Sequence, residues 1–168
     1  SKEAFEPNSG EVKMYVCGPN LYGPCHVGHA MSYVFFDTLR RYLEYLGYTV
    51  RHVQNFTDIE DRIIQVAQDQ GTSIGAVSQP YIDRFLSEMD QLGVQRATEY
   101  PRATDYIAQM VEIIQTLIDK GYAYAADGGD VYFRVRRFSG YGRLSKRTLD
   151  EMEAGSRIEV DPKKEDPL

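Results

Sequence analysis

The sequence predicts an α/β fold whose amino-terminal part contains a parallel sheet, followed by a smaller α+β part. Two observations support this prediction. Residues 12–17 and 49–55 have the alternation of strands, and the residues between them have the apolar spacing of an amphipathic helix. A strand, a helix and a strand joined by short connections form a βαβ unit with parallel strands and a right-handed crossover. A chain of 168 residues can hold one or two such domains.

The first strand, residues 12–17, leads into Gly-Pro-Asn at 18–20, which is typical of a loop at a strand end. The helix that follows has apolar residues at intervals of three and four and is expected to stop at Gly47. These apolar positions are Met31, Val34, Phe35, Leu39, Tyr42, Leu43 and Leu46.

Two more helices are expected after the second strand, over residues 58–70 and 74–92, where they would cover the sheet. Thr57 or Asp58 is the candidate cap of the first of them. The sequence pattern then changes at Glu-Tyr-Pro-Arg, residues 99–102, so we expect a first domain over residues 1–100.

The second domain, residues 101–168, is predicted to contain a helix, a hairpin and a short helix. The helix spans residues 104–120 and is expected to bury its apolar face. That face consists of Ile107, Val111, Ile114, Leu117 and Ile118. Residues 122–126 and 131–135 are strand-like, and Asp-Gly-Gly-Asp at 127–130 supplies the turn between them. The chain ends in a turn-like stretch, so we expect a fragment of a longer protein.

The composition argues against several classes of protein. The net charge is -6 and no run of Lys and Arg stands out, so the main surface for any RNA is expected outside this chain. No apolar run approaches the roughly 18 residues of a membrane helix, and the start lacks a signal-peptide core. We therefore expect a cytoplasmic location and no membrane partner. The two cysteines, Cys17 and Cys25, are too few for a disulfide framework.

The most informative stretch is residues 17–29, between the first strand and the first helix, where open α/β sheets bind ligands. His26 and His29 lie at a helix start, where unpaired N–H groups and the helix dipole favour an anion. Gly28 lets a nucleotide approach the backbone, and we expect a seat for a triphosphate. Two alternatives stay open here: the histidines are ordinary loop residues, or they form a metal site with the two cysteines.

Several segments of the chain resemble one known family, in order. Residues 14–22, Met-Tyr-Val-Cys-Gly-Pro-Asn-Leu-Tyr, and residues 26–29, His-Val-Gly-His, resemble the cysteinyl-tRNA synthetase form of the class I "HIGH" signature. Residues 55–61 resemble that family's Asn-x-Thr-Asp-x-x-Asp segment. The likeness continues at residues 101–104, 129–133, 141–145 and 154–157, and so covers nearly the whole chain.

The resemblance implies the first half of a Rossmann-type class I synthetase catalytic domain, followed by a connective insertion. It implies a ligase that joins L-cysteine to AMP from ATP, releases pyrophosphate and passes the cysteinyl group to tRNA(Cys). Mg²⁺ and Zn²⁺ are the implied metals. The tRNA would be held mainly by later parts of the protein, and a monomer is expected. The isolated chain is expected to be inactive, because the second ATP motif and the other zinc ligands of the family lie beyond it.

The resemblance also assigns roles to residues. The catalytic donors are His26 and His29. The ATP-binding set is Pro19, Asn20, Tyr22, His26, Gly28 and His29. The substrate set is Cys17, Gly18, Asn20 and Thr57, with Cys17 as the zinc ligand in this chain. Asn20 stands where the family usually has Thr, and Gly-Pro at 23–24 replaces an Asp-containing pair, so the positioning of substrates is expected to differ.

Two other functions remain as alternatives. One is the related ligase of mycothiol synthesis, which activates cysteine in the same way and transfers it to an amino sugar. The other is a non-catalytic paralogue that keeps the fold and binds a nucleotide or a partner protein. The hairpin and residues 141–145 favour the synthetase.

Overall fold

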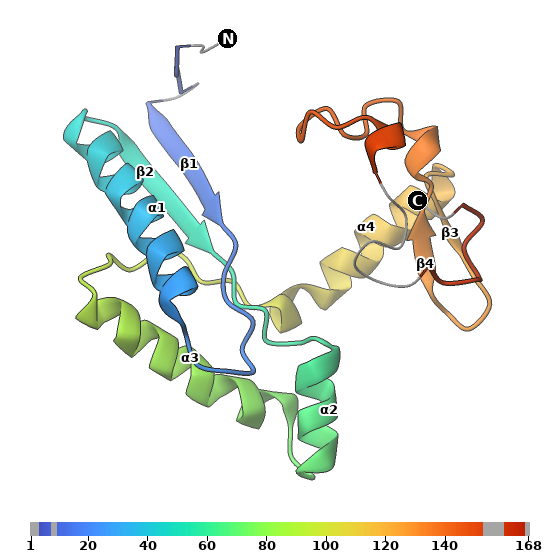
Figure 1. The fold of residues 1–168 in the computed structure, drawn as a ribbon, viewed down its shortest axis with the longest axis horizontal. Coiled ribbons are helices and arrows are strands. Elements are labelled where there is room, and N and C mark those ends of the chain that lie inside the picture. Colours follow the sequence, from blue (N-terminus) through green and yellow to red (C-terminus); the bar gives the residue numbers. More distant parts are fainter. Residues whose placement is uncertain (1–3, 8–9, 153–159, 167–168) are drawn as a thin grey trace. The chain divides into compact units, whose positions relative to one another are not determined.

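The computed structural model describes residues 4–7, 10–152 and 160–166, so the family-like segment at 154–157 lies outside the described residues (Figure 1). It forms two compact units, residues 1–106 and 107–168. The elements are β1 (Glu11–Val16), α1 (Val27–Tyr45), β2 (Thr49–Gln54), α2 (Asp61–Asp69), α3 (Ile74–Gln91), the short 3₁₀ helix η1 (Ala103–Tyr106), α4 (Ile107–Asp119), β3 (Ala123–Ala125), β4 (Val131–Phe133) and the 3₁₀ turns η2 (Val135–Arg137) and η3 (Leu149–Glu151).

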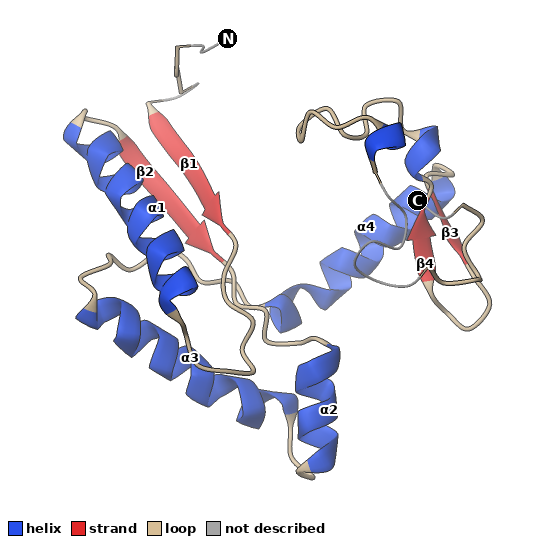
Figure 2. Cartoon of the chain, viewed as in Figure 1, coloured by secondary structure: helices blue, strands red, loops and turns tan. Residues whose placement is uncertain are grey.

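The first unit is built on the predicted βαβ unit (Figure 2). Strands β1 and β2 pair in parallel, from Glu11 opposite Thr49 to Val16 opposite Gln54, and α1 connects them. The predicted α/β class with a parallel sheet is therefore confirmed. Helix α1 begins at Val27, four residues before the predicted apolar spacing starts at Met31. The spacing does not mark the first turn because that turn contains predicted site residues, Gly28 and His29, instead of core residues.

The outer edge of β2 is paired with the chain segment that follows α3. The amide of Gln54 donates to the carbonyl of Glu99 at 3.0 Å, and the amide of Phe56 donates to that of Pro101 at 2.9 Å. This pairing keeps residues 98–103 with the first unit, which ends at residue 106. The domain boundary after residue 100 stays a prediction.

The core of the first unit lies at the carboxyl end of the sheet, between the strand ends and the helices. Its aromatic centre is Phe56, which contacts Phe85 of α3 edge-on and stacks on Tyr100. The buried members are Val16, Leu21, Tyr33, Phe56, Ile63, Ala67, Val77, Ile82, Phe85 and Met89. Because Val16 and Leu21 belong to this core, the loop that follows β1 is packed against it.

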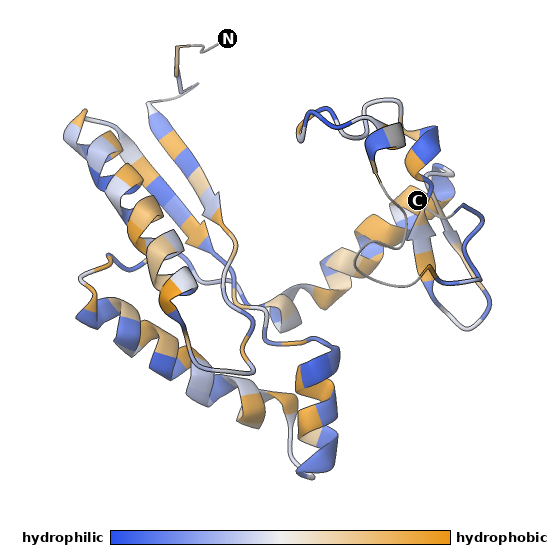
Figure 3. Cartoon of the chain, in the orientation of Figure 1, coloured by the Kyte–Doolittle hydropathy of each residue, from blue (hydrophilic) through white to orange (hydrophobic). Residues whose placement is uncertain are grey.

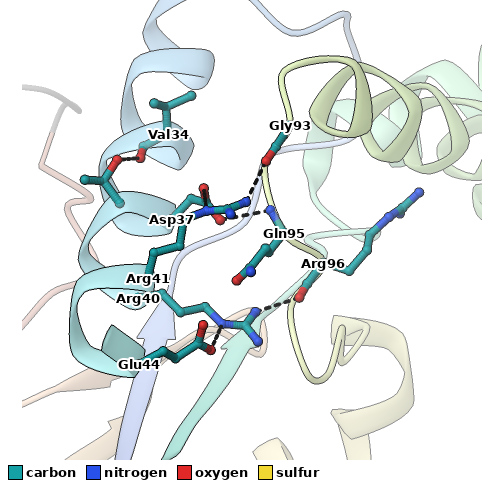
Figure 4. Close-up of polar contacts among 9 residues, drawn as sticks. Val34, Asp37, Arg40, Arg41, Glu44, Gly93, Gln95 and Arg96 are labelled. Carbon is teal, nitrogen blue, oxygen red and sulfur yellow. Dashed lines mark hydrogen bonds and ion pairs between the residues drawn. The ribbon is translucent and has the colours of Figure 1, made fainter. Parts of the chain in front are cut away.

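Helix α1 is fastened to the loop after α3 by the buried carboxylate of Asp37 and by two arginines (Figure 4). The Asp37 carboxylate accepts hydrogen bonds from the backbone N–H of Gln95 at 2.9 Å and from the guanidinium group of Arg41 at 2.7 Å. The guanidinium groups of Arg40 and Arg41 donate to the carbonyls of Arg96 and Gly93. These bonds fix the position of α1, and with it the position of the residues at its amino-terminal end.

The apolar face of α1 is largely exposed in the first unit, and Figure 3 shows apolar residues along this helix. Met31 is 74% exposed and Phe35 is 64% exposed, whereas the buried residues of the helix are Tyr33 and Asp37. On β1, the side chain of Tyr15 is also exposed. One face of the sheet and one face of its crossover helix are thus uncovered by the described residues.

The second unit contains the predicted hairpin. Strands β3 and β4 pair antiparallel, with Ala123 opposite Phe133, and positive φ angles at Gly128 and Gly129 make the turn between them. The predicted burial of the α4 face is wrong: Val111 is 59% exposed and Ile114 is 39% exposed. Helix α4 packs against β3, and of its predicted apolar face only Leu117 and Ile118, near its end, are half-buried. No helix among the described residues has the length and apolar character needed to cross a membrane.

Candidate functional site

A pocket of about 370 Å³ opens in the loop between β1 and α1. The predicted site residues that line it are Cys17, Gly18, Pro19, Asn20, Tyr22, His26 and His29, together with Gly23 and Pro24. Gly28 and Thr57 of the predicted set do not line it. The pocket lies at the carboxyl end of β1 and at the amino-terminal end of α1, which is where open α/β sheets bind their ligands.

His26 and His29 start helix α1 through a reciprocal capping box. The amide of Gly28 donates to Nδ1 of His26 at 3.1 Å, and the amide of His26 donates to Nδ1 of His29 at 3.3 Å. The two rings stack with their centroids 3.9 Å apart. Each imidazole thus satisfies an amide that a helix start would otherwise leave unpaired.

This capping fixes which ring nitrogen carries the proton. A neutral imidazole whose Nδ1 accepts a hydrogen bond holds its proton on Nε2, so both rings keep an Nε2–H donor available for a ligand. Partial burial lowers the pKa of His29, and the neighbouring His26 lowers that pKa further. His29 is therefore a neutral donor at neutral pH.

Gly28 leaves room for the His26 ring. A Cβ at Gly28 would lie 3.0 Å from Cε1 and 3.1 Å from Nδ1 of His26. These distances are tighter than ordinary contacts, so a side chain here would push the capping ring aside. Gly28 thus acts on the pocket through His26, although it does not line the pocket itself.

Asn55 holds together residues of the predicted substrate set, although no role was predicted for Asn55 from the sequence. Its Oδ1 accepts from the amide of Gly18 at 2.8 Å, and its Nδ2 donates to Oγ1 of Thr57 at 3.3 Å. Thr57 forms an isolated parallel bridge with Asn20. Asn55 therefore links three residues of the predicted substrate set. Its place in the matched segment 55–61 was the available signal.

Gly18 lies where the two strands come too close for a side chain. A Cβ on Gly18 would lie 1.5 Å from the carbonyl oxygen of Asn55. The loop after β1 can take its course only because this residue has no Cβ.

Asp58 has a different role from the predicted one. It does not cap α2, whose N-cap residue is Glu60 with no side-chain cap bond. The buried Asp58 carboxylate instead accepts from the amide of Thr104 at 3.0 Å and from its hydroxyl at 2.6 Å. Asp58 thus caps the backbone at η1, because the paired segment 98–103 brings Thr104 close to the end of β2.

The two cysteines have different environments. Cys17 is exposed at the pocket, whereas Cys25 packs against the core. Burial raises the pKa of the Cys25 thiol to about 11, and a hydrogen bond with Glu88 contributes to the rise. Only the thiolate is a good metal ligand, so this rise in pKa disfavours Cys25 as a ligand. Among the described residues, no three His, Cys, Asp or Glu side chains converge on one point.

Two further residues shape the pocket from beneath and beside it. The hydroxyl of Tyr33 donates to the carbonyl of Cys17 at 3.3 Å and so holds the end of β1 to α1. The guanidinium carbon of Arg62 lies 4.6 Å from the centre of the Tyr22 ring. This cation–π contact fixes one wall of the pocket. Neither residue carries a sequence motif, so only the fold reveals them.

The sequence matches one protein family over nearly its whole length. The family model described as "tRNA synthetases class I (C) catalytic domain" matches residues 4–168. The chain is 50% identical over 168 residues to the cysteine–tRNA ligase of Geobacillus thermodenitrificans (strain NG80-2), covering 99% of this chain and 36% of that protein. It is also 50% identical over 169 residues to that of Clostridioides difficile (strain 630), covering 100% of this chain. The chain thus spans 36% of the length of these curated relatives.

Solved structures share the fold. A methionyl-tRNA synthetase of Mycobacterium tuberculosis, solved with methionyl-adenylate, superposes with a TM-score of 0.59 at 22% identity and covers 67% of this chain and 23% of its own. The LeuRS of Agrobacterium radiobacter K84, solved as a ternary complex, gives a TM-score of 0.62 at 23% identity over 84% of this chain and 23% of its own. At these identities the likeness concerns the fold alone.

Proposed function

Because this chain belongs to the family of class I (C) tRNA synthetase catalytic domains, we propose that the protein activates L-cysteine with ATP and transfers it to tRNA(Cys). The observation that carries the proposal is the capped histidine pair, whose two Nε2–H groups remain available beside the exposed thiol of Cys17. The names of the relatives, cysteine–tRNA ligases, support the choice of amino acid.

In the proposed activation step, a carboxylate oxygen of cysteine attacks the α-phosphorus of ATP in line. A P–O bond forms, and the bond to pyrophosphate breaks. His26 and His29 donate hydrogen bonds to the phosphate oxygens on which negative charge grows, and the start of α1 adds its dipole. No proton has to move to or from either ring, since the pyrophosphate leaves as an anion. A bound Mg²⁺ would neutralise part of the phosphate charge.

The substrate cysteine would lie toward Gly18 and Thr57, on the side that Asn55 organises. The exposed Cys17 fits a zinc ligand here, with the remaining ligands outside the described residues. A bound zinc ion would favour the substrate thiolate over the hydroxyl of serine, which pocket size alone discriminates poorly. A monomeric state and a cytoplasmic location stay predictions.

The proposal is tested by cysteine-dependent exchange of labelled pyrophosphate into ATP. The assay is run on the complete product of the gene and on the 168-residue chain, with zinc and magnesium present. We expect exchange by the complete product, loss of exchange with serine, and little exchange by the 168-residue chain.

Cys17→Ser and Cys25→Ser form a matched pair for this assay. Cys17→Ser is expected to abolish exchange, whereas Cys25→Ser is expected to retain it, because Cys25 packs against the core and does not line the pocket. Absence of exchange by the complete product would leave the non-catalytic paralogue as the better account. Exchange without aminoacylation of tRNA, but with transfer to an amino sugar, would favour the mycothiol-type ligase.

A further inference from the structure

The pocket between β1 and α1 offers hydrogen-bond donors to a phosphate but no permanent positive charge. Among the described residues, its lining contains no Lys, Arg, Asp or Glu. His29 is a neutral donor, because burial and the neighbouring His26 lower its pKa. A triphosphate carries several negative charges, and phosphate sites commonly add a cation to the neutral donors. A cation close to this pocket is therefore a candidate for that part of the ligand.

Arg62 of α2 lies beside the pocket. Its guanidinium carbon is 4.6 Å from the centre of the Tyr22 ring, and Tyr22 lines the pocket. Both residues belong to the same compact unit. Helix α2 follows β2, so its first turn, which contains Arg62, lies at the carboxyl end of the parallel strands, as the pocket does. The fold thus brings a cation from a second helix to the wall of the pocket.

Arg62 is the exception among the arginines of the first unit. Its side chain is exposed and forms no ion pair or hydrogen bond with another described residue, although Glu60 and Asp61 precede it. Each of the other arginines of the unit has a carboxylate or amide oxygen as its partner. These pairs are Arg40 with Glu44, Arg41 with Asp37, Arg51 with Glu99, Arg84 with Glu88, Arg96 with Asp90 and Arg102 with Gln79.

The contact with Tyr22 holds Arg62 without consuming its donors. A cation–π contact is made to the face of the ring and needs none of the N–H groups of the guanidinium. These N–H groups form a planar fork that matches two oxygens of a phosphate. Arg62 is therefore held by an uncharged partner, with its charge and its donors available to a ligand.

We propose that Arg62 binds the β- and γ-phosphates of ATP, the part that leaves as pyrophosphate, from its position on Tyr22. Arg62 does not line the pocket itself, so it meets only a ligand that extends past Tyr22. In the proposed activation step His26 and His29 serve the α-phosphate, and the phosphates beyond it carry the charge that Arg62 neutralises. The inference deepens the proposed function and rests on it.

The test compares the binding of labelled ATP and labelled AMP to the complete product of the gene by equilibrium dialysis, with magnesium and without cysteine. Arg62→Gln is expected to weaken ATP binding about tenfold or more, which is the effect of losing a hydrogen bond to a charged group. It should leave AMP binding unchanged, because AMP has no β- and γ-phosphates. Arg62→Lys keeps the charge and loses the fork, so its loss of ATP affinity should be smaller.

Two further variants complete the dialysis experiment. Lys13→Gln removes one positive charge from an exposed position of β1 outside the pocket and should bind ATP as the parent does. In a Tyr22→Leu background, Arg62→Gln should cost less ATP affinity than in the parent, because the ring no longer holds Arg62. Equal costs in the two backgrounds would overturn the role of Tyr22. Equal losses for ATP and AMP, or ATP binding by Arg62→Gln as tight as by Lys13→Gln, would overturn the role of Arg62.

Pyrophosphate exchange separates this proposal from the proposed function. Arg62→Gln should raise KM for ATP about tenfold or more and leave KM for cysteine unchanged. A loss of protein stability would not divide the two constants in this way. Absence of exchange by the parent protein would contradict the proposed function, whereas unchanged KM values in Arg62→Gln would contradict the role of Arg62 alone.

Discussion

At the scale of single residues, the two histidines combine a structural and a chemical task. Their Nδ1 atoms cap α1, and their Nε2–H groups remain for a ligand. The sequence could place both residues at a helix start beside a strand end, because the spacing and the flanking elements are local. It could not reveal the reciprocal cap, which depends on the rotamers that both rings adopt.

A substitution can separate these two tasks. Asn is a good N-cap residue, so His26→Asn is expected to keep the free energy of unfolding within about 0.5 kcal/mol of the parent. It removes one Nε2–H donor, and loss of such a donor costs about 100-fold or more in rate. Urea unfolding and pyrophosphate exchange by the complete product measure the two effects.

His26→Ala serves as the comparison, because it removes the cap and the donor together. We expect it to lose about 1 kcal/mol of stability in addition to the exchange activity. Normal exchange by His26→Asn would contradict the role of His26 as a donor to the phosphates.

Gly18 offers a second test at this scale. Gly18→Ala would bring a Cβ onto the carbonyl of Asn55, and the backbone would have to shift, at a cost of about 3 kcal/mol or more. Gly23→Ala in the same pocket is the control, since a Cβ there meets nothing within 4 Å and should change stability by less than about 0.5 kcal/mol. Thermal unfolding measures the stability of both variants. Equal stabilities would show that a Cβ at position 18 does not meet the carbonyl of Asn55.

At the scale of elements, the sequence predicted the βαβ unit, the helices and the hairpin, because each has a local apolar period or a turn signal. It misassigned Asp58, whose partner Thr104 lies 46 positions away. A carboxylate before a helix is typical of a cap, and only the pairing of residues 98–103 with β2 provides the competing partner. The role of Asn55 was missed for the same reason, because its hydrogen bond with Gly18 joins the ends of two strands that are distant in the sequence.

Asp37 tests the attachment of α1 to the loop after α3. Asp37→Ala removes the acceptor of the Gln95 amide and of Arg41, and leaves a half-buried amide unpaired. We expect a loss of about 1–3 kcal/mol in the free energy of unfolding. Asp83→Ala on α3, where the exposed carboxylate is bonded only to Gln79 among the described residues, should lose less than about 0.5 kcal/mol. Similar losses in the two variants would mean that the attachment contributes little.

The buried His52 of β2 predicts a pH dependence. Burial lowers its pKa, Arg40 lowers it further, and Asp37 opposes the shift. The unfolded chain therefore takes up this proton more readily, and stability falls as the pH drops through about 6.5. His29, whose pKa is also lowered, adds to the same trend.

Urea unfolding at pH 7 and pH 5 measures this effect. In His52→Leu the loss of stability between the two pH values should be smaller than in the parent, with the share of His29 remaining. An equal loss in both proteins would show that His52 titrates alike in the folded and unfolded chains.

At the scale of the whole molecule, the apolar face of α1 is the feature that the helical period alone could not interpret. The period marks Phe35 as part of an apolar face but does not say what covers it, and in the first unit Phe35 is 64% exposed. The same holds for Val111 of α4 in the second unit. A large exposed apolar patch marks a surface for contact, and the curated relatives are longer than this chain.

This exposure predicts dye binding by the folded chain. The 168-residue chain should enhance the fluorescence of 8-anilinonaphthalene-1-sulfonate while it still unfolds cooperatively. Phe35→Gln/Tyr42→Gln should reduce the enhancement at least twofold, because both side chains are exposed on α1. Gln substitutions at the exposed Leu92 and Val131 serve as the control. An undiminished signal in the α1 variant would place the dye elsewhere.

The reciprocal cap also bears on how this signature would behave in evolution. His26 and His29 start α1 whether or not a nucleotide is bound, so selection for a stable helix start alone would preserve a capping side chain at position 26, and Asn would serve there as well as His. A descendant that had lost catalysis could therefore replace His26 by another capping residue and still keep the fold. Retention of both histidines would then indicate that their Nε2–H donors are still in use, and a capping residue without such a donor would mark the loss of the chemistry.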